Sequence, residues 1–281
     1  MNTYRLRVLH VSDIHAKCPT TSAQNLNDID AISFARAIDS FIAILSETQA
    51  DYPVDVVCIT GDIAHSGQKE QYLVAQSLFA RIAQALFKNI EFTTASQNFF
   101  IVPGNHDIER NKEQALWKKA RTVLQGNDRT VSQWLHKRWR PTGTRKDLHD
   151  ILKRSESYTS WIKECYPHIS KDFGTRGPIG YYYKLVTNKF PFPIHISGLD
   201  SSWLCGDDKD HLNIVLTTEQ IDQLSYTQNA KHEDGFRLAL LHHPLTWLRD
   251  HNECKTLLAK SSDLLLCVEV SPSVWTEKGL V

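Results

Sequence analysis

The sequence predicts an α/β fold built on a largely parallel sheet. Apolar, β-type runs alternate with stretches whose apolar residues recur at three- and four-residue steps, as Ile32, Ala35, Ile38, Ile42 and Leu45 do. Strand, helix and strand in succession form the βαβ pattern, whose crossovers are right-handed and whose strands pair in parallel. With 281 residues, the chain can bury a substantial core, as one α/β domain or as one domain that carries an insertion.

Seven runs are expected to form strands, and four further stretches are expected to form helices. The strands are expected over residues 5–12, 54–60, 98–103, 180–186, 193–199, 237–242 and 263–268. The helices are expected near residues 28–50, 68–88, 217–229 and 246–259. Thr217 or Thr218 can cap the third of these helices, because a threonine hydroxyl accepts a hydrogen bond from the first turn.

Residues 110–176 interrupt the strand pattern with a charged stretch that resembles several helices. They carry 16 Lys and Arg against 7 Asp and Glu, whereas residues 1–109 carry 7 against 12 and residues 177–281 carry 9 against 13. We therefore expect one domain made of residues 1–109 and 177–281, with 110–176 as a basic helical insertion beside the functional site. The tryptophans of this insertion are Trp117, Trp134, Trp139 and Trp161.

The insertion has two interpretations. Basic residues together with tryptophans suit a phosphate backbone with stacked bases, which would make the partner a nucleotide or a nucleic acid. Alternatively, the insertion is a solvated helical cap whose tryptophans form a small core of their own.

Composition excludes several classes of protein. No run approaches the roughly 18 apolar residues of a membrane span, so no membrane partner is expected. The N-terminus lacks the charged-then-apolar pattern of a signal peptide. The six cysteines are scattered, without a Cys-x-x-Cys pair, and are expected to be buried thiols of a cytoplasmic protein.

Polar clusters follow four of the expected strands. In α/β folds the carboxyl ends of the strands face the ligand site, so these clusters are expected to converge. Carboxylate oxygens, imidazole nitrogens and an amide oxygen in one place describe a divalent metal site. In chain order the clusters are Asp13 with His15, Asp62, Asn105 with His106 and Asp107, and His242 with His243.

The expected ligands are distributed over all four clusters. Asp13 and His15 stand two residues apart, so both can reach one ion as the chain leaves its strand. Asp62 follows a glycine at a second strand end and is suited to bridge two cations, although alone it could also be a turn or N-cap residue. Asn105 offers a neutral oxygen, and His242 is preferred to its neighbour as a ligand because of its position.

Three further residues receive other roles. His106, next to the ligand Asn105, can donate a proton or a hydrogen bond to a reacting oxygen. Asp107 is expected to orient that imidazole and raise its basicity. His243 is expected either to contact substrate or to satisfy a backbone carbonyl.

These motifs, in their order and spacing, resemble those of the calcineurin-like metallophosphoesterases. The resemblance rests on Asp13-x-His15, Gly61-Asp62, Gly104-Asn105-His106-Asp107 and His242, and it covers most of the chain outside residues 110–176. It implies a four-layer α/β/β/α sandwich and a metal-dependent phosphoesterase. The basic insertion makes a phosphodiesterase or nuclease the preferred form.

The resemblance also implies a two-metal site bridged by Asp62 and by a hydroxide. Asp13 and His15 would bind the first ion, and Asn105 and His242 the second. The ions would be Mn, Fe, Zn or Ni, which such oxygen and nitrogen ligands accept. His106 would serve the leaving oxygen or the phosphoryl group.

One departure from the family pattern concerns the last motif. The family has Gly-His-x-His after a strand like residues 263–267, whereas this chain reads Cys267-Val268-Glu269-Val270-Ser271 and has no histidine after His251. The C-terminal part is therefore expected to be incomplete relative to the family. The alternatives to an active enzyme are a degenerate, catalytically weak binding module and the N-terminal domain of a larger protein.

Overall fold

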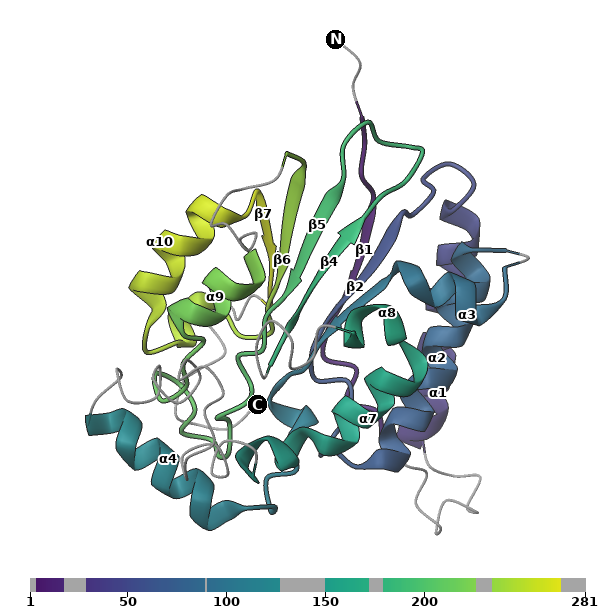
Figure 1. Cartoon of the computed structure of the whole chain (residues 1–281). Coiled ribbons are helices and arrows are strands. Elements are labelled where there is room, and N and C mark those ends of the chain that lie inside the picture. Colours follow the sequence, from purple (N-terminus) through teal and green to yellow (C-terminus); the bar gives the residue numbers. More distant parts are fainter. Residues whose placement is uncertain are drawn as a thin grey trace.

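Two β-sheets face each other at the centre of the molecule, with helices outside each of them (Figure 1). The structure is a computed structural model, and it describes residues 4–17, 29–88, 90–126, 150–171, 179–225 and 234–268. Both sheets follow from the predicted alternation of apolar strands and amphipathic helices.

The first sheet is parallel, with the strand order β1-β2-β3. Its strands are β1 (Val8–Val11), β2 (Val56–Thr60) and β3 (Phe99–Val102). The crossovers contain α1 (Ile29–Thr48) and α2 (Lys69–Leu86), and the short α3 (Phe92–Ala95) and η1 (Ser96–Asn98) lead into β3. The two βαβ units predicted from the sequence are thus confirmed.

The second sheet has four strands in the order β4-β5-β6-β7, and only β4 runs antiparallel to its neighbour. The strands are β4 (Tyr181–Leu185), β5 (Ile194–Gly198), β6 (Phe236–Leu240) and β7 (Leu264–Leu266). The helices α9 (Thr218–Ser225) and α10 (His251–Ser261) cover its outer face. All seven expected strands are present, with slightly shifted or shorter bounds.

The later helices differ from their expected bounds. Of the two candidate caps for α9, Thr217 makes the bond, because its Oγ1 accepts from the Gln220 amide at 3.3 Å. The helix expected near residues 246–259 begins five residues later, because Pro244 leads into a short 3-10 turn, η4 (Leu245–Trp247). The expected end of the third helix, near residue 229, lies outside the described residues.

The period of β6 explains the four layers. Leu238 and Leu240 belong to the main core between the sheets, whereas Ala239 and Leu241 belong to a second core against α9 and α10. Successive side chains of a strand point to opposite faces, so one apolar strand supplies both cores. The predicted α/β/β/α sandwich is confirmed.

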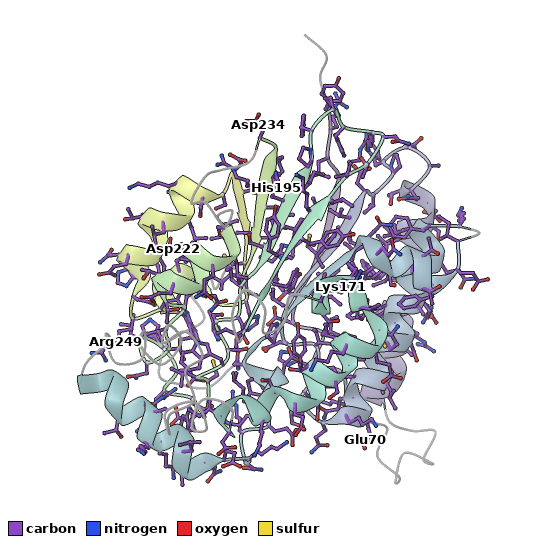
Figure 2. The ribbon with its side chains drawn as sticks, in the orientation of Figure 1. Glu70, Lys171, His195, Asp222, Asp234 and Arg249 are labelled. Carbon is purple, nitrogen blue, oxygen red and sulfur yellow. The ribbon has the colours of Figure 1, made fainter. Side chains whose placement is uncertain are left out.

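The second sheet is also linked by a buried histidine, His195 on β5, which Figure 2 labels together with Asp234. Its Nδ1 lies 2.6 Å from the hydroxyl of Tyr182 on β4, and its Nε2 lies 3.1 Å from the Asp234 carbonyl just before β6. Buried polar atoms need such partners, because leaving one unpaired costs roughly 1–3 kcal/mol. His195 therefore connects three neighbouring segments of the sheet away from the polar clusters.

The described part of the insertion packs against the rest of the chain. It contains α4 (Gln114–Gly126), η3 (Lys153–Ser155), α7 (Glu156–Cys165) and α8 (Pro167–Ser170). Trp161 stacks on Tyr72 of α2, with 5.1 Å between ring centroids, and Trp117 donates its Nε1 proton to the Leu204 carbonyl at 2.7 Å. Both indoles are buried in protein and, as placed, present no face to a nucleic-acid base. Trp134 and Trp139 lie outside the described residues.

Two expectations from composition concern the whole molecule. Across the described ranges, no helix is both long and apolar enough to cross a membrane. None of the cysteines in the described ranges, which exclude Cys18, forms a disulfide. Cys58, Cys205 and Cys254 are buried, as expected, whereas Cys165 and Cys267 are only half-buried.

His168 of α8 makes the fold sensitive to acid. Its Nε2 donates to the Phe99 carbonyl at 2.9 Å, and its Nδ1 is buried without a partner among the described residues. Burial lowers the pKa of His168 to about 4 from 6.5. Between these values the unfolded chain binds a proton that the folded chain does not, so the free energy of unfolding falls as the pH falls from 6.5 to 4.

We expect His168→Gln to remove part of this acid sensitivity. The glutamine amide can still donate to Phe99 but does not titrate. The wild type should lose up to roughly 3 kcal/mol more than the variant between pH 6.5 and 4, at 1.36 kcal/mol per pKa unit. Urea unfolding at several pH values measures this difference, with His211→Gln, at an exposed histidine, as the control. Parallel stability curves for wild type and His168→Gln would contradict the assignment.

Candidate metal centre

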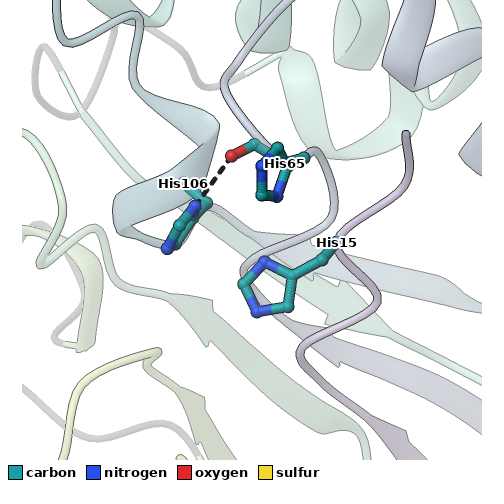
Figure 3. A group of neighbouring side chains, drawn as sticks. All are labelled: His15, His65 and His106. Carbon is teal, nitrogen blue, oxygen red and sulfur yellow. Dashed lines mark hydrogen bonds between the residues drawn. The ribbon is translucent and has the colours of Figure 1, made fainter. Parts of the chain in front are cut away.

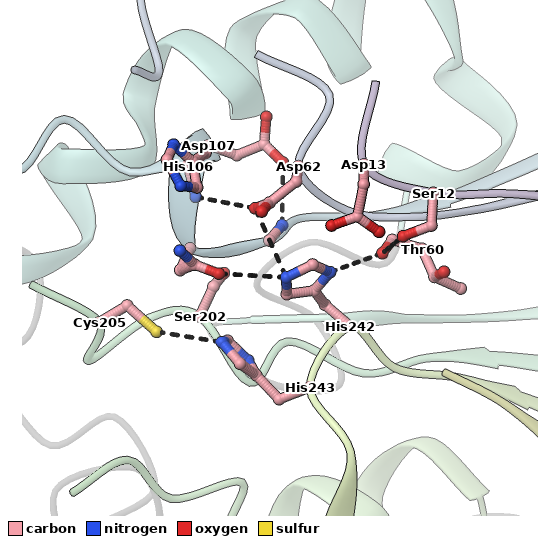
Figure 4. A network of polar contacts seen from close by, with 12 residues as sticks. Ser12, Asp13, Thr60, Asp62, His106, Asp107, Ser202, Cys205, His242 and His243 are labelled. Carbon is pink, nitrogen blue, oxygen red and sulfur yellow. Dashed lines mark hydrogen bonds and ion pairs between the residues drawn. The ribbon is translucent and has the colours of Figure 1, made fainter. Parts of the chain in front are cut away.

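The five residues predicted as metal ligands lie together at the carboxyl ends of their strands. Figure 4 shows three of them, Asp13, Asp62 and His242. His242, from the second sheet, has its Nε2 3.1 Å from Asn105 Oδ1 and 3.5 Å from Asp62 Oδ1. His15 Nε2 lies 3.7 Å from Asp62 Oδ2 and 3.9 Å from Asp13 Oδ1. The two facing sheets thus bring four separate chain segments to one place, as the strand-end rule predicts.

The Asp62 carboxylate divides the cluster into two sets. Its Oδ1 faces Asn105 and His242, and its Oδ2 faces His15 and, beyond it, Asp13. Asp62 is only 4% exposed, and a buried carboxylate requires hydrogen bonds or cations to offset the loss of water. One oxygen toward each set is the arrangement that a carboxylate bridging two ions would have.

The hydrogen bonds of His242 test whether a cation fits. Its Nδ1 lies 2.7 Å from the Thr60 carbonyl, which can only accept, so Nδ1 carries a proton. The Nε2 of the neutral ring is then an acceptor, and it faces two further acceptors, Asn105 Oδ1 and Asp62 Oδ1. Asp62 Oδ1 also accepts from the His106 amide at 2.9 Å, but Nε2 and Asn105 Oδ1 face each other as two acceptors at 3.1 Å, and a cation among the three atoms would relieve their repulsion. The donor set therefore fits a divalent cation, and the Thr60 contact fixes the metal-binding tautomer.

The first set also favours a neutral imidazole. Burial lowers the pKa of His15, and this effect outweighs the attraction of the neighbouring Asp62 and Asp13 carboxylates, which raises it. Asp13, His15 and Asp62 form a group whose ligand atoms all lie within 4.8 Å of one another. A neutral ring beside two carboxylates is a suitable site for an ion such as Mn²⁺ or Zn²⁺.

Three of these ligands stand on left-handed backbone. The φ angles are 57° at Asp13, 48° at His15 and 52° at Asp62. Such conformations cost of order 1–3 kcal/mol each when the side chain is not glycine, and they cluster at functional sites. The amides of Asp13 and His15 donate to the carbonyls of Gly61 and Asp62 at 3.2 and 2.8 Å, which holds both loops in this strained form.

Two glycines allow the close approach of the loops. A Cβ on Gly104 would lie 2.2 Å from Asp62 Oδ1 and 2.4 Å from the Asp62 amide nitrogen. A Cβ on Gly61, whose φ is +82°, would lie 2.6 Å from both the Gly104 nitrogen and His242 Nδ1. Any larger residue at either position would push apart the groups that face the expected ions. The glycines of the Gly61-Asp62 and Gly104-Asn105 motifs are thus explained by space as well as by backbone conformation.

His106 lies beside the expected ligands and is held by its own loop. Its amide donates to Asp62 Oδ1 at 2.9 Å, and its ring Nδ1 lies 2.7 Å from the His65 carbonyl. Since that carbonyl can only accept, Nδ1 carries a proton, and Nε2 remains available to a substrate. When the ring is protonated, Nε2 can donate to a substrate oxygen, as the predicted role requires.

Asp107 does not orient the His106 imidazole as predicted, because its carboxylate bonds to other groups. Its Oδ1 accepts from the Ala64 amide at 2.9 Å and from the Tyr72 hydroxyl at 3.1 Å, and its Oδ2 accepts from the Gly104 amide at 2.9 Å. The carboxylate is fully buried, and burial raises its pKa to about 6. Asp107 therefore ties the loops after β2 and β3 together, and the orienting contact to His106 comes from a carbonyl instead.

The prediction that His243 binds substrate is also wrong. It is 2% exposed, its Nδ1 lies 2.8 Å from Ser201 Oγ, and its Nε2 lies 3.7 Å from Cys205 Sγ. Burial lowers its pKa well below the usual value, with a further contribution from His242. In this position His243 supports the strand end that carries His242 and makes no contact with open solvent.

Two residues of the site were not predicted. The Thr60 carbonyl accepts a hydrogen bond from the His242 ring, and the His65 carbonyl accepts one from the His106 ring. Backbone acceptors leave no trace in residue type, so the sequence could not identify these contacts. The His65 side chain is exposed near His15 and His106, and its place three residues after Asp62 was the only available signal.

The segment after β7 reaches the same region. The Val268 amide donates to the His242 carbonyl at 3.0 Å, and the Leu241 amide donates to the Leu266 carbonyl at 2.9 Å. Val268, the last described residue, therefore lies beside His242. Glu269 lies outside the described residues.

Comparison with known proteins agrees with this geometry. No curated protein is significantly similar to the chain. The model of one family, described as calcineurin-like phosphoesterase, matches residues 6–268 and so includes every residue of the cluster. This match covers nearly the whole sequence, and the chain therefore belongs to the calcineurin-like phosphoesterase family.

Proposed function

We propose that this protein is a metal-dependent phosphodiesterase. The family supports phosphoester hydrolysis in general, and the preference for a diester rests on the surroundings of η2 (Asn105–Asp107). A cavity of about 380 Å³ is lined by Val102 and Pro103, just before η2, and another of about 370 Å³ by His106 and Ile108. A phosphodiester carries two organic groups, and these two cavities, one lined by residues just before η2 and one by residues of η2 and after it, offer each group a place. This pair of cavities is the observation that carries the proposal.

The charged residues of these cavities favour a polar substrate. The first is lined by Lys153 and Lys163 from the insertion, and the second by Arg110 and Lys112. Lys112 donates to Glu156, Arg110 pairs with Asp208, and Glu109 also lines the second cavity, so part of this positive charge is neutralised. Nucleotides or short nucleic acids, which combine phosphates with polar sugars, match this lining.

The chemistry follows from the residues already placed. When bound, two divalent ions would polarise the phosphoryl oxygens and lower the pKa of water toward neutrality. Asp13, His15, Asp62, Asn105 and His242 would hold them, and Mn²⁺ is the ion that we propose to test first. His106, once protonated, donates a proton from Nε2 to the leaving oxygen, while its Nδ1 stays bonded to a carbonyl. The free cysteines of the described residues support a cytoplasmic location.

The test compares two substrates on the purified chain. Metal analysis should find bound Mn²⁺, and the Mn-loaded chain should hydrolyse bis-p-nitrophenyl phosphate faster than p-nitrophenyl phosphate. EDTA should abolish both reactions, because removal of the ions takes away their polarisation of the phosphoryl group and of the attacking water. Faster hydrolysis of the monoester would overturn the assignment to a diester.

A second candidate function follows from the sequence after β7. The family motif Gly-His-x-His is replaced by Cys267-Val268-Glu269-Val270, which removes two imidazoles from the expected ligand set. This favours a catalytically weak module that binds a phosphoester without turnover. Mn²⁺ binding together with undetectable hydrolysis of both nitrophenyl esters would support this second function over the first.

A further inference from the structure

Three histidines from three different loops meet at the edge of the metal cluster (Figure 3). His15 follows β1, His65 follows β2 and His106 belongs to η2. Each offers one ligand nitrogen, and these nitrogens all lie within 4.8 Å of one another. The ring centroids of His15 and His106 are 4.6 Å apart, and the rings of His65 and His106 stack at 5.8 Å. The trio of His15, His65 and His106 overlaps the Asp13–His15–Asp62 group at His15 alone.

The hydrogen bonds leave nitrogens free for a ligand. The His106 ring uses Nδ1 toward the His65 carbonyl, so its Nε2 is available. Within the described part of the chain, no hydrogen bond engages either ring nitrogen of His65. His15 directs Nε2 toward Asp13 and Asp62. Its ring can therefore serve the two-metal cluster or the trio, and the two uses compete for one side chain.

The donor types separate the trio from the neighbouring cluster. The cluster combines the oxygens of Asp13, Asp62 and Asn105, which Mn²⁺ and Mg²⁺ accept readily, with the imidazoles of His15 and His242, whereas the trio supplies imidazole nitrogens alone. Imidazole suits Zn²⁺, Ni²⁺ and Cu²⁺, and these ions bind nitrogen sites more tightly than Mn²⁺ does. Three histidines with one side open to solvent are also a familiar arrangement for a four-coordinate ion. The side chain of His65 is exposed, so an ion can enter from solvent.

We propose that His15, His65 and His106 bind a borderline-soft divalent cation such as Ni²⁺ or Zn²⁺ and that this binding inhibits the enzyme. The ion occupies the Nε2 of His106 that protonates the leaving oxygen and draws His15 away from its place beside Asp62. The inhibitory effect rests on the proposed function, whereas the binding of the ion does not.

Nickel binding tests the site without any substrate. Calorimetric titration of the Mn-loaded chain with Ni²⁺ should find one more site in the wild type than in His65→Phe. Phenylalanine keeps the ring contact with His106 but has no nitrogen. The matched control is His211→Phe, at an exposed histidine whose ring contacts Trp247, and it should bind as the wild type does. Loss of even an outer-shell contact weakens metal affinity by about 10- to 100-fold, so loss of a ligand should do at least as much. Equal Ni²⁺ binding by wild type and His65→Phe would overturn the proposal.

Inhibition tests the functional consequence. Each variant's hydrolysis of bis-p-nitrophenyl phosphate with Mn²⁺ is compared with its own rate after Ni²⁺ is added. His65→Phe should need at least about 10-fold more Ni²⁺ for half-inhibition than the wild type or His211→Phe. Equal half-inhibition would overturn the inhibitory role. If the Mn-loaded wild type shows no turnover, the proposed function fails, and the calorimetric difference still decides whether the nickel site exists.

Discussion

Asp62→Asn is expected to remove most of the bound metal from the protein and to lower phosphodiester turnover by at least about 100-fold. Each carboxylate oxygen of Asp62 faces a different ligand set, so the substitution weakens both sets at once. Asparagine keeps the shape, but it removes the negative charge and turns one metal-facing oxygen into an NH₂ group. Metal ions contribute several kcal/mol of charge stabilisation, and each 1.36 kcal/mol corresponds to a factor of ten in rate.

The comparison with His15→Ala makes this prediction specific to a bridging role. His15 faces only one carboxylate set, so its loss should leave more metal on the chain than Asp62→Asn does. Asp39→Asn provides the control, because Asp39 is an exposed carboxylate paired with Arg81 away from the cluster. Metal content is measured on each purified variant by elemental analysis. Equal metal loss in Asp62→Asn and His15→Ala would contradict the bridging role.

The position of the cluster was predictable because strand ends obey a simple rule. Asp62 and His242 are 180 residues apart in the chain and follow strands of different sheets, yet each comes just after the carboxyl end of a β run, and the two facing sheets bring these ends together. Similarly, the alternation of apolar runs with amphipathic stretches was sufficient for the βαβ units. The sequence did not predict the exact start of α10, because the 3-10 turn after Pro244 is a tertiary detail.

The two wrong predictions, the roles of Asp107 and His243, have geometrical causes. Residues 105–107 form a 3-10 turn, in which successive side chains point about 120° apart, so His106 and Asp107 face different surroundings. Adjacency in sequence was therefore a poor guide to their contact. His242 and His243 lie in a bend after β6, with 78° between their ring planes. Only His242 faces the cluster, whereas His243 bonds to Ser201, and the residue types alone did not reveal this difference.

The contacts of backbone carbonyls were beyond the reach of sequence. The Thr60 carbonyl sets the tautomer of His242, and the His65 carbonyl sets that of His106. Every residue has a carbonyl, so residue type cannot say which one is directed at an imidazole. The two histidines are nevertheless held in the same way. Nδ1 of His242 bonds to the end of β2, Nδ1 of His106 bonds to the loop after β2, and in each ring Nε2 points to the reaction site. The β2 segment thus positions both the expected ligand and the expected acid.

His106→Ala is expected to slow turnover by about 10²–10⁴-fold while leaving Mn²⁺ content close to that of the wild type. The amide of His106, which donates to Asp62, survives the substitution, and the five expected ligands keep their side chains. The loss should depend on the leaving group, since a nitrophenolate needs little protonation and an alcohol needs much.

We therefore expect a larger loss on a dinucleotide, whose leaving group is an alcohol, than on bis-p-nitrophenyl phosphate. His251→Ala is the control and should affect both substrates little, because the His251 ring Nδ1 lies 3.0 Å from the Leu248 carbonyl, just before α10. Rates are measured at saturating Mn²⁺, with metal content determined on the same samples. An equal loss on both substrates would argue that His106 binds the phosphoryl group and does not protonate the leaving oxygen, and unchanged turnover would remove it from the reaction altogether.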